Sequence, residues 1–235
     1  MAATPAGAAG LALTSLALLT ALLAPLLAPA DPFALSGPPL APPSPDHLMG
    51  TDALGRDLLS AVLYGARTSL LVAAAVGALA FVLGAGIGLL SGYRGGRLDD
   101  LLMRATELVQ VLPRFFLAIV AIALFGPGLD RIVIVLGITS WPVLARVVRS
   151  EALSLRSLDF VRAAEASGAT GSRIILRELL PNALPSAMVV LGLLLGQVLL
   201  IEASLGFLGL GDPNLVSWGG LAGQAQSYLR VAWWL

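Results

Sequence analysis

The sequence contains no cysteine, no lysine and a single histidine, His47. Without cysteine it has no disulfide, no thiolate nucleophile and no cysteine-based metal site. All 14 basic residues are arginine, so the chain lacks the lysine that a P-loop ATPase places on the nucleotide phosphates and the amine of a Schiff base. One histidine cannot form a cluster of metal ligands. We therefore expect no enzyme active site and no cofactor on this chain.

Charge is also scarce in the sequence. Charged residues make up 12% of the chain, roughly half the share in soluble domains. Hydrophobic residues make up 57%, and several apolar runs approach the ~20 residues that cross a bilayer as a helix. The formal net charge is zero, so nothing points to nucleic acid. These features predict an all-α, polytopic transmembrane helix bundle in a lipid bilayer.

The apolar runs predict five spans and the beginning of a sixth. No basic residue precedes the first run, and it is longer than the ~7–15 residues of a signal-peptide core, so an uncleaved span is favoured over a signal peptide. Trp141-Pro142 interrupts the fourth span, and the sixth begins at the C-terminal VAWWL. The five spans are predicted at residues 9–27, 69–90, a segment ending near Phe125, 132–148 and 183–206.

Residues 1–67 form a first region, made of span one and a Pro-rich segment, and residues 68–235 form the core of the bundle. The proline density prevents continuous helix and favours extended backbone. In GTDALGRDLLSAVLYGARTSL, apolar residues at helical spacing predict an interfacial helix that leads into span two. Asp52, Arg56 and Asp57 at its start either contact a partner or order the loop, and ordering is the favoured interpretation.

Glycines repeat every four residues in two of the spans. Such a stripe makes a flat helix face that allows close approach of a second helix. Packing within this chain is favoured for the first stripe, and packing against a partner subunit is the alternative. The stripes are Gly84, Gly88 and Gly92 in span two, and Gly192 and Gly196 in span five.

Polar residues at membrane depth mark a candidate translocation path. Span three carries Glu107, Gln110 and Pro113 near Arg114. Charges at membrane depth face a bundle interior or a water-filled path, and a proline frees backbone groups to line it. Alternatively, this turn lies at the headgroup level with Arg114 snorkelling. Glu202 in span five is a third candidate for the path, with an interfacial position as its alternative.

The arginines gather in alternate loops. Three follow span two and six surround the segment after span four, whereas the turn after span three has Arg131 alone. Because basic residues mark the cytoplasmic side, the N-terminus and residues 150–182 are predicted to be cytoplasmic and the Pro-rich segment external. Arg56 and Arg67 are the exceptions to this pattern.

Residues 150–182 predict a helical hairpin around FVRAAEASGATGSRIILRELLPNALPS. Ser157 is the expected N-cap of its first helix. Gly168 is the expected C′ residue, where a left-handed backbone is needed. Thr170 is expected to cap a second short helix, which Pro181 ends.

The hairpin has an apolar side and a small-residue side, and its role has two possible interpretations. Phe160 and Val161 can fill a pocket beside the small surface of Ala163 and Ala164. The hairpin either packs under its own bundle or docks onto a cytoplasmic partner.

Ala163-Ala164, Gly168 and Leu180-Pro181 resemble the EAA loop of permease subunits of binding-protein-dependent ABC importers. Three further blocks, in order along nearly the whole chain, are similar to the second permease subunit of dipeptide, oligopeptide and nickel importers: GTDALGRDLLSAVLYGARTSL, SGYRGGRLDDLLMR and EASLGFLGLGDPNLVSWG. Arg162 stands where the family has glutamate, which puts a salt bridge from that position in doubt. The family has a sixth span after the final tryptophan pair, where this sequence stops.

The resemblance implies a type I ABC importer permease fold in the bacterial plasma (inner) membrane. It implies a heterodimer with a second permease, two cytoplasmic ATPase subunits and an extracytoplasmic solute-binding protein. Di- or oligopeptides are the implied substrates, with nickel as the alternative and a secondary transporter as the alternative of a different class.

The resemblance also implies that the hairpin couples the permease to the ATPases. The implied coupling residues are Phe160, Val161, Arg162, Ala163, Ala164, Gly168, Leu180 and Pro181.

Overall fold

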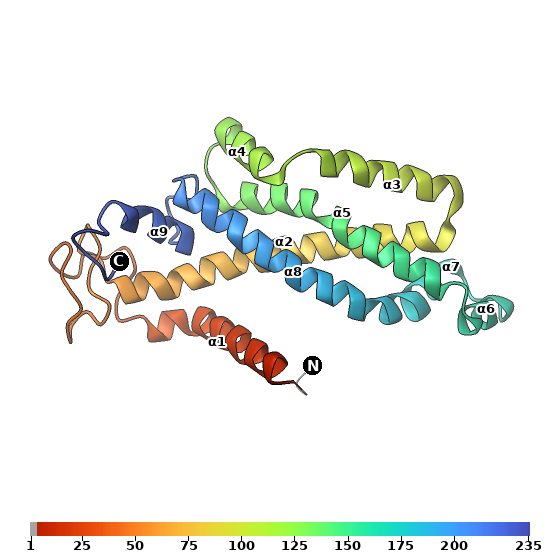
Figure 1. The fold of residues 1–235 in the computed structure, drawn as a ribbon, viewed down its shortest axis with the longest axis horizontal. Helices are drawn as coiled ribbons and strands as arrows, with labels where there is room; N and C mark the ends of the chain where they lie inside the picture. Colours follow the sequence, from red (N-terminus) through yellow and green to blue (C-terminus); the bar gives the residue numbers. More distant parts are fainter. Residues whose placement is uncertain (1–3) are drawn as a thin grey trace. The chain divides into compact units, whose positions relative to one another are not determined.

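The computed structural model describes residues 4–235. Over these residues it is helical, with two isolated β-bridges and no longer strand. Figure 1 shows the helices along the chain. They are α1 (Pro5–Leu27), α2 (Leu58–Arg94), α3 (Gly96–Val111), α4 (Arg114–Phe125), α5 (Leu129–Leu155), α6 (Asp159–Ala166), α7 (Gly171–Ile174), the π-helical turn η1 (Ile175–Leu179), α8 (Leu180–Phe207) and α9 (Trp218–Gln226).

The helices form two compact units, each built from segments distant in sequence. Unit one contains the chain up to Val72, the turn Phe125–Leu129 and Leu199–Leu235. Unit two contains Ala73–Leu124 and Asp130–Val198. The predicted boundary at residue 67 stays a prediction.

Within residues 4–235, four helices are long and apolar enough to cross a membrane: α1, α2, α5 and the continuous run Gly171–Phe207. The pair α3 and α4, bent by 71° at its break, makes a fifth span if counted as one. The break falls at Pro113, where the sequence predicts it. The final residues, Val231–Leu235, lie in turns, with the Trp234 Nε1 donating to the Thr51 carbonyl at 3.4 Å.

Two predicted helix breaks are wrong. Pro142 lies inside the unbroken α5, and α8 continues through Pro181 and Pro185. Membrane helices tolerate proline because neighbouring groups satisfy the freed carbonyls. A second feature explains why the helix continues through Pro181. The preceding turn is π-helical, with the Leu180 amide hydrogen-bonded to the Ile175 carbonyl, and this wider turn accommodates the proline ring.

Close packing of α2 on α5 organises unit two. A Cβ added at Gly84 would lie 2.8 Å from the Leu144 Cβ, and one at Gly92 would lie 2.6 Å from the Ala152 Cβ. At Gly88 the obstacle is the Ala145 carbonyl oxygen, at 2.6 Å. These contacts confirm that the first glycine stripe packs within the chain.

The glycine stripe of α8 lies in open space among the described residues. A Cβ at either Gly192 or Gly196 would meet nothing within 4 Å in the described part of the chain. The glycines of span two are in close contact with another helix of the chain, whereas the described residues leave the two glycines of span five open.

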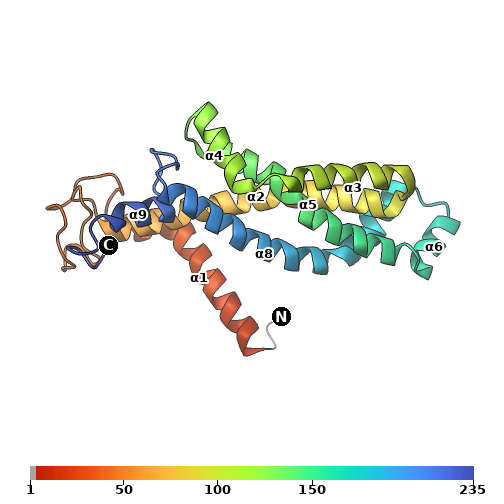
Figure 2. The same ribbon diagram turned by 45° about the horizontal axis from the view of Figure 1, so that its top comes forward.

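Helix α3 lies alongside α2 and α5 in unit two (Figure 2). The Arg149 guanidinium of α5 donates from Nε and Nη2 to the Asp99 carboxylate, with both distances 2.5 Å. The Ser91 hydroxyl of α2 donates to the same carboxylate. Since Asp99 is only 7% exposed, this network fastens three helices together at a buried point.

The segment before α2 is ordered by its own acidic residues in unit one. The Asp52 Oδ1 accepts from the backbone amides of Leu54 and Arg56 at 2.8 and 2.9 Å. The Asp57 Oδ2 accepts from the Ser60 amide and hydroxyl at 2.8 and 2.7 Å. These bonds support the predicted ordering role of Asp52 and Asp57.

Asp57 makes the stability of this segment pH-dependent. Burial raises the pKa of Asp57, but hydrogen bonds from Ser60 and His47 outweigh it and hold the pKa below its usual value. A lowered pKa contributes stability above the unfolded-state value, and this stability is lost as pH falls through the folded-state value. We therefore expect acid to destabilise the wild-type protein more than Asp57→Asn, which is already weakened at neutral pH by about 1–3 kcal/mol.

Thermal unfolding of both proteins in detergent, followed by tryptophan fluorescence from pH 7 to pH 3, measures this difference. The exposed Asp46, in the same segment, supplies the control Asp46→Asn, whose pH profile should match wild type. Parallel profiles for wild type and Asp57→Asn would contradict the assignment.

Candidate functional site

The segment between α5 and α8 forms the predicted hairpin. Its first helix, α6, lies beyond the end of α5 (Figure 1). Asp159 occupies the first turn, where a negative charge interacts favourably with the helix dipole. The predicted N-cap is wrong: Leu158 occupies that position without a side-chain bond, and the Ser157 hydroxyl donates instead to the Ser154 carbonyl at 2.8 Å.

The glycine turn after α6 is formed as predicted. Gly168 has a φ of 80°, a left-handed backbone that favours glycine. Its amide donates to the Glu165 carbonyl at 2.9 Å, and the Ala169 amide donates to the Ala164 carbonyl at 3.0 Å. These two bonds make a Schellman motif, which satisfies carbonyls at the helix end.

The second half of the hairpin is continuous with α8. Thr170 is the residue before α7, as predicted, but its side chain makes no capping bond. Because α7, η1 and α8 follow one another without a break, the hairpin is one short helix joined by the Gly168 turn to the beginning of a long span. A rigid connection therefore runs from the turn into the membrane helix.

A hydrophobic core holds the hairpin to unit two. Val161 and Leu179 are fully buried and Ile174 nearly so, among residues of α2, α5 and α8. Ala164 and Leu180 are partly buried against the same cluster. Val161 therefore belongs to the core of the hairpin and is not available to a partner in this conformation.

The opposite side of the hairpin is exposed. Phe160 is 38% exposed. Arg162, Ala163 and Gly168 are exposed as well, and a Cβ at Gly168 would meet nothing within 4 Å. Pro181 is exposed on the first turn of α8.

A cavity of about 300 Å³ opens between α6 and the following turn. Its walls are mostly small side chains, with one residue of each charge. The lining residues are Ala164, Ser167, Gly168, Ala169, Arg173, Ile174 and Glu178.

Two polar contacts brace the hairpin against the end of α2. The Tyr93 hydroxyl donates to the Glu165 carboxylate at 3.3 Å. The Arg156 guanidinium donates to the Gly92 carbonyl at 3.1 Å, which satisfies a carbonyl at the C-terminal end of α2. The site is therefore a braced, capped tip with one exposed face.

The model of the family "binding-protein-dependent transport system inner membrane component" matches residues 84–229, more than half of the chain and the whole of the hairpin. The chain belongs to this family. It is an ABC importer permease, a multi-pass membrane protein, and this decides against the secondary-transporter interpretation.

The permease is similar over most of its length to curated relatives. It is 42% identical over 229 residues to a putative peptide transport system permease protein of Brucella suis biovar 1 (strain 1330), covering 96% of this chain and 77% of the relative. It is 36% identical over 234 residues to the di/tripeptide transport system permease protein DppC of Pseudomonas aeruginosa (strain UCBPP-PA14), covering 96% and 77%. With DppC of Bacillus subtilis (strain 168), named for dipeptide transport, the identity is 38% over 195 residues, covering 82% and 61%.

Among solved structures, the permease resembles a chain of the MetNI methionine ABC transporter in an inward-facing conformation. The TM-score is 0.59 at 23% identity, covering 73% of this chain and 81% of that one. The likeness establishes a shared fold, the type I importer permease fold.

The three candidate path residues of the permease have different surroundings. Glu107 is exposed and Gln110 half-buried on α3 of unit two. Glu202, on the part of α8 in unit one, is 5% exposed and accepts from the Ser69 hydroxyl of α2 at 2.9 Å. The Trp218 backbone amide of α9 donates a hydrogen bond to the Ser69 hydroxyl oxygen at 3.4 Å. Glu202 is therefore buried within unit one, where the Ser69 hydroxyl links it to α2 and α9.

Sequence reasoning missed the Asp99–Arg149 pair of the permease. Its members lie 50 residues apart, and each resembles an ordinary loop charge near a span end. The sequence feature that could have predicted the pair is that one acidic and one basic residue lie near the same predicted membrane face.

Proposed function

We propose that this permease couples ATP hydrolysis on separate cytoplasmic ATPase subunits to the uptake of di- and oligopeptides. The observation that carries the proposal is the exposed face of a hairpin whose other face is buried in the bundle core. The absence of lysine removes the phosphate-binding lysine of a P-loop from this chain, so hydrolysis falls to partner subunits. Relatives named for peptide transport support the substrate class.

The ATPase contact is formed by Phe160, Ala163 and the Gly168 turn. A partner aromatic or aliphatic side chain fits the small-residue cavity behind Gly168, which has a volume of about 300 Å³. Arg173 lines this cavity and Arg162 is exposed on α6; both add charged contacts around the apolar centre of the interface, where charges mainly set specificity and association rate.

Movement of the ATPases passes from the turn into the membrane through α7, η1 and α8. Leu180 and Pro181 lie at the point where the hairpin becomes span five. A continuous helix transmits displacement better than a flexible loop, and the core around Val161 prevents the hairpin from swinging freely. Closure of the ATPases thereby changes which side of the permease is open.

The assembly contains a second permease in a heterodimer, two ATPases and an extracytoplasmic solute-binding protein. The N-terminus and the hairpin are cytoplasmic, as the arginine distribution predicts. The solute-binding protein docks on the external segments 30–67 and 207–230. Glu107, Gln110 and Glu202 are the candidates for the translocation path, with Glu202 acting through the packing of α8.

Affinity purification of this subunit through a terminal tag, from membranes of its native host, tests the assembly. We expect an ATPase and a second permease to copurify in defined stoichiometry. A preparation that retains the second permease but contains no ATPase would contradict the proposal.

A further inference from the structure

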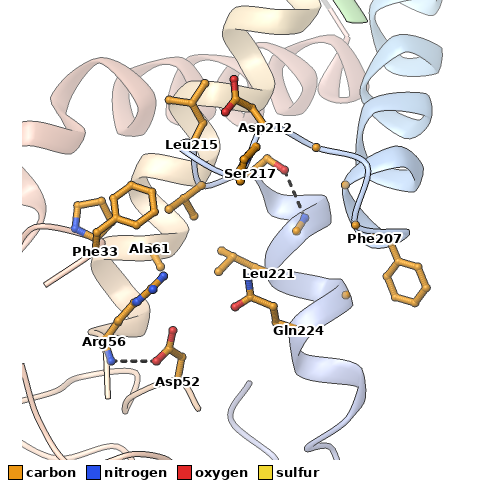
Figure 3. A pocket seen from close by; sticks show the side chains of 18 of the residues that line it. Phe33, Asp52, Arg56, Ala61, Phe207, Asp212, Leu215, Ser217, Leu221 and Gln224 are labelled. Atoms are coloured by element: carbon orange, nitrogen blue, oxygen red, sulfur yellow. Dashed lines mark hydrogen bonds between the residues drawn. The ribbon is translucent and has the colours of Figure 1, made fainter. Parts of the chain in front are cut away.

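Unit one contains a cavity of about 460 Å³ (Figure 3). The segment before α2 forms one side, and the end of α8 with the loop into α9 and α9 itself forms the other. Its volume is within the ~300–1,000 Å³ of small-molecule sites. The residues that carry side-chain chemistry are Phe33, Asp52, Arg56, Asp212, Leu221 and Gln224.

Arg56 is the cation of this cavity, and among residues 4–235 it is held by an aromatic ring and not by a counter-ion. Its guanidinium carbon lies 5.5 Å from the centroid of the Phe33 ring, within cation–π range. Its Nε is buried and has no acceptor among residues 4–235. No carboxylate of the described chain forms an ion pair with it. Figure 3 shows the side chain rising beside Phe33, opposite Leu221 and Gln224.

Both acids of the cavity are engaged in turns of their own. The Asp52 Oδ1 accepts two backbone amides, including that of Arg56. The Asp212 Oδ1 accepts the Asn214 amide at 2.9 Å. The guanidinium of Arg56 is thus a preorganised donor fork, and its strongest complement is a carboxylate, which it can bind through two parallel hydrogen bonds.

We propose that this cavity binds the terminal carboxylate of a short peptide, with Arg56 as the residue that holds it. The volume is much larger than one acidic side chain requires, and it suits a di- or tripeptide. Phe33 and Leu221 provide apolar surface for peptide side chains, and the Gln224 amide can pair with a peptide group. The proposal rests on peptide import as the function of the permease, and adds a direct peptide contact on the permease itself.

Calorimetric titration of the purified, assembled transporter, without its solute-binding protein, tests the site. The probes are alanyl-phenylalanine and its C-terminal amide. Hydrogen bonds to charged groups contribute about 1.5–3 kcal/mol, so we expect the free acid to bind about 10-fold to 100-fold more tightly than the amide. Arg56→Gln should weaken binding of the acid by a similar factor and leave binding of the amide unchanged. Arg67→Gln, at an exposed position of α2 in the same unit, should change neither.

Equal affinity for acid and amide on the wild-type transporter would overturn the proposal without reliance on any variant. Undetectable peptide binding to the wild-type transporter would also overturn it. An Arg56-dependent affinity for the solute-binding protein would then show that Arg56 binds a carboxylate of that protein. ATP-driven peptide uptake by the same preparation distinguishes failure of this site from failure of the proposed function. If the preparation imports peptide but shows no preference for the free acid, the peptide site in this cavity is refuted and the importer function is not.

Discussion

Gly168→Pro should abolish peptide uptake while ATP hydrolysis continues. Proline fixes φ near −65°, whereas Gly168 has a φ of 80° and donates its amide to Glu165. Proline can satisfy neither condition, and a backbone misfit of about 1–3 kcal/mol corresponds to a loss of about 5-fold to 150-fold in the population of the docking conformation. Uptake into proteoliposomes, measured together with ATPase rate, tests this expectation.

Gly168→Asn is the matched control for the proline variant. Asparagine also occurs at the left-handed position that ends helices, and a Cβ there would meet nothing within 4 Å. We expect at least half of the wild-type uptake. Both variants should reach the membrane in normal amounts, because the turn lies outside the spans. Wild-type transport by Gly168→Pro would refute the role given to the hairpin.

Asp99→Asn should destabilise unit two strongly. Removing one partner of a buried ion pair costs about 3–5 kcal/mol. Because the Arg149 side chain remains 32% exposed, water offsets part of this loss, and we expect about 2–3 kcal/mol. For a chain of this size, that corresponds to a decrease in Tm of about 5–10 °C. Thermal unfolding in detergent, with the assembled transporter, measures it.

The neighbouring Asp100 provides the control. It lies on the same helix but is exposed, so Asp100→Asn should change Tm by less than about 2 °C, the range of ordinary surface substitutions. If the two substitutions lower Tm equally, the Asp99–Arg149 bond does not fasten α2, α3 and α5 together.

Local features of the hairpin could be predicted from the sequence, because their causes are local. A glycine directly after an alanine-rich helix predicts a left-handed residue that ends the helix. The structure confirms the positive φ of Gly168 and the backbone hydrogen bonds of the turn. The glycine stripe of α2 could also be predicted, because a four-residue spacing places the glycines on one helix face whichever helix packs against it.

Features that depend on tertiary contacts could not be predicted. Val161 and Phe160 are adjacent and both apolar, but only the packed structure shows that one is buried and the other exposed. Pro181 is a helix stop by propensity, and the π-helical turn before it overrides that preference. The Asp99–Arg149 pair and the contact of Arg56 with Phe33 depend on segments that are separated in the chain.

Photo-cross-linking from a single cysteine tests most directly whether the hairpin contacts an ATPase. The chain has no native cysteine, so Ala163→Cys, at an exposed position of α6, and Asn214→Cys, at an exposed position of the loop before α9, each carry one thiol for a benzophenone maleimide. In the active, assembled transporter, illumination should yield an adduct with the ATPase subunit from Ala163→Cys and none from Asn214→Cys. An active transporter that gives no ATPase adduct from Ala163→Cys, or equal adducts from both positions, would contradict the account.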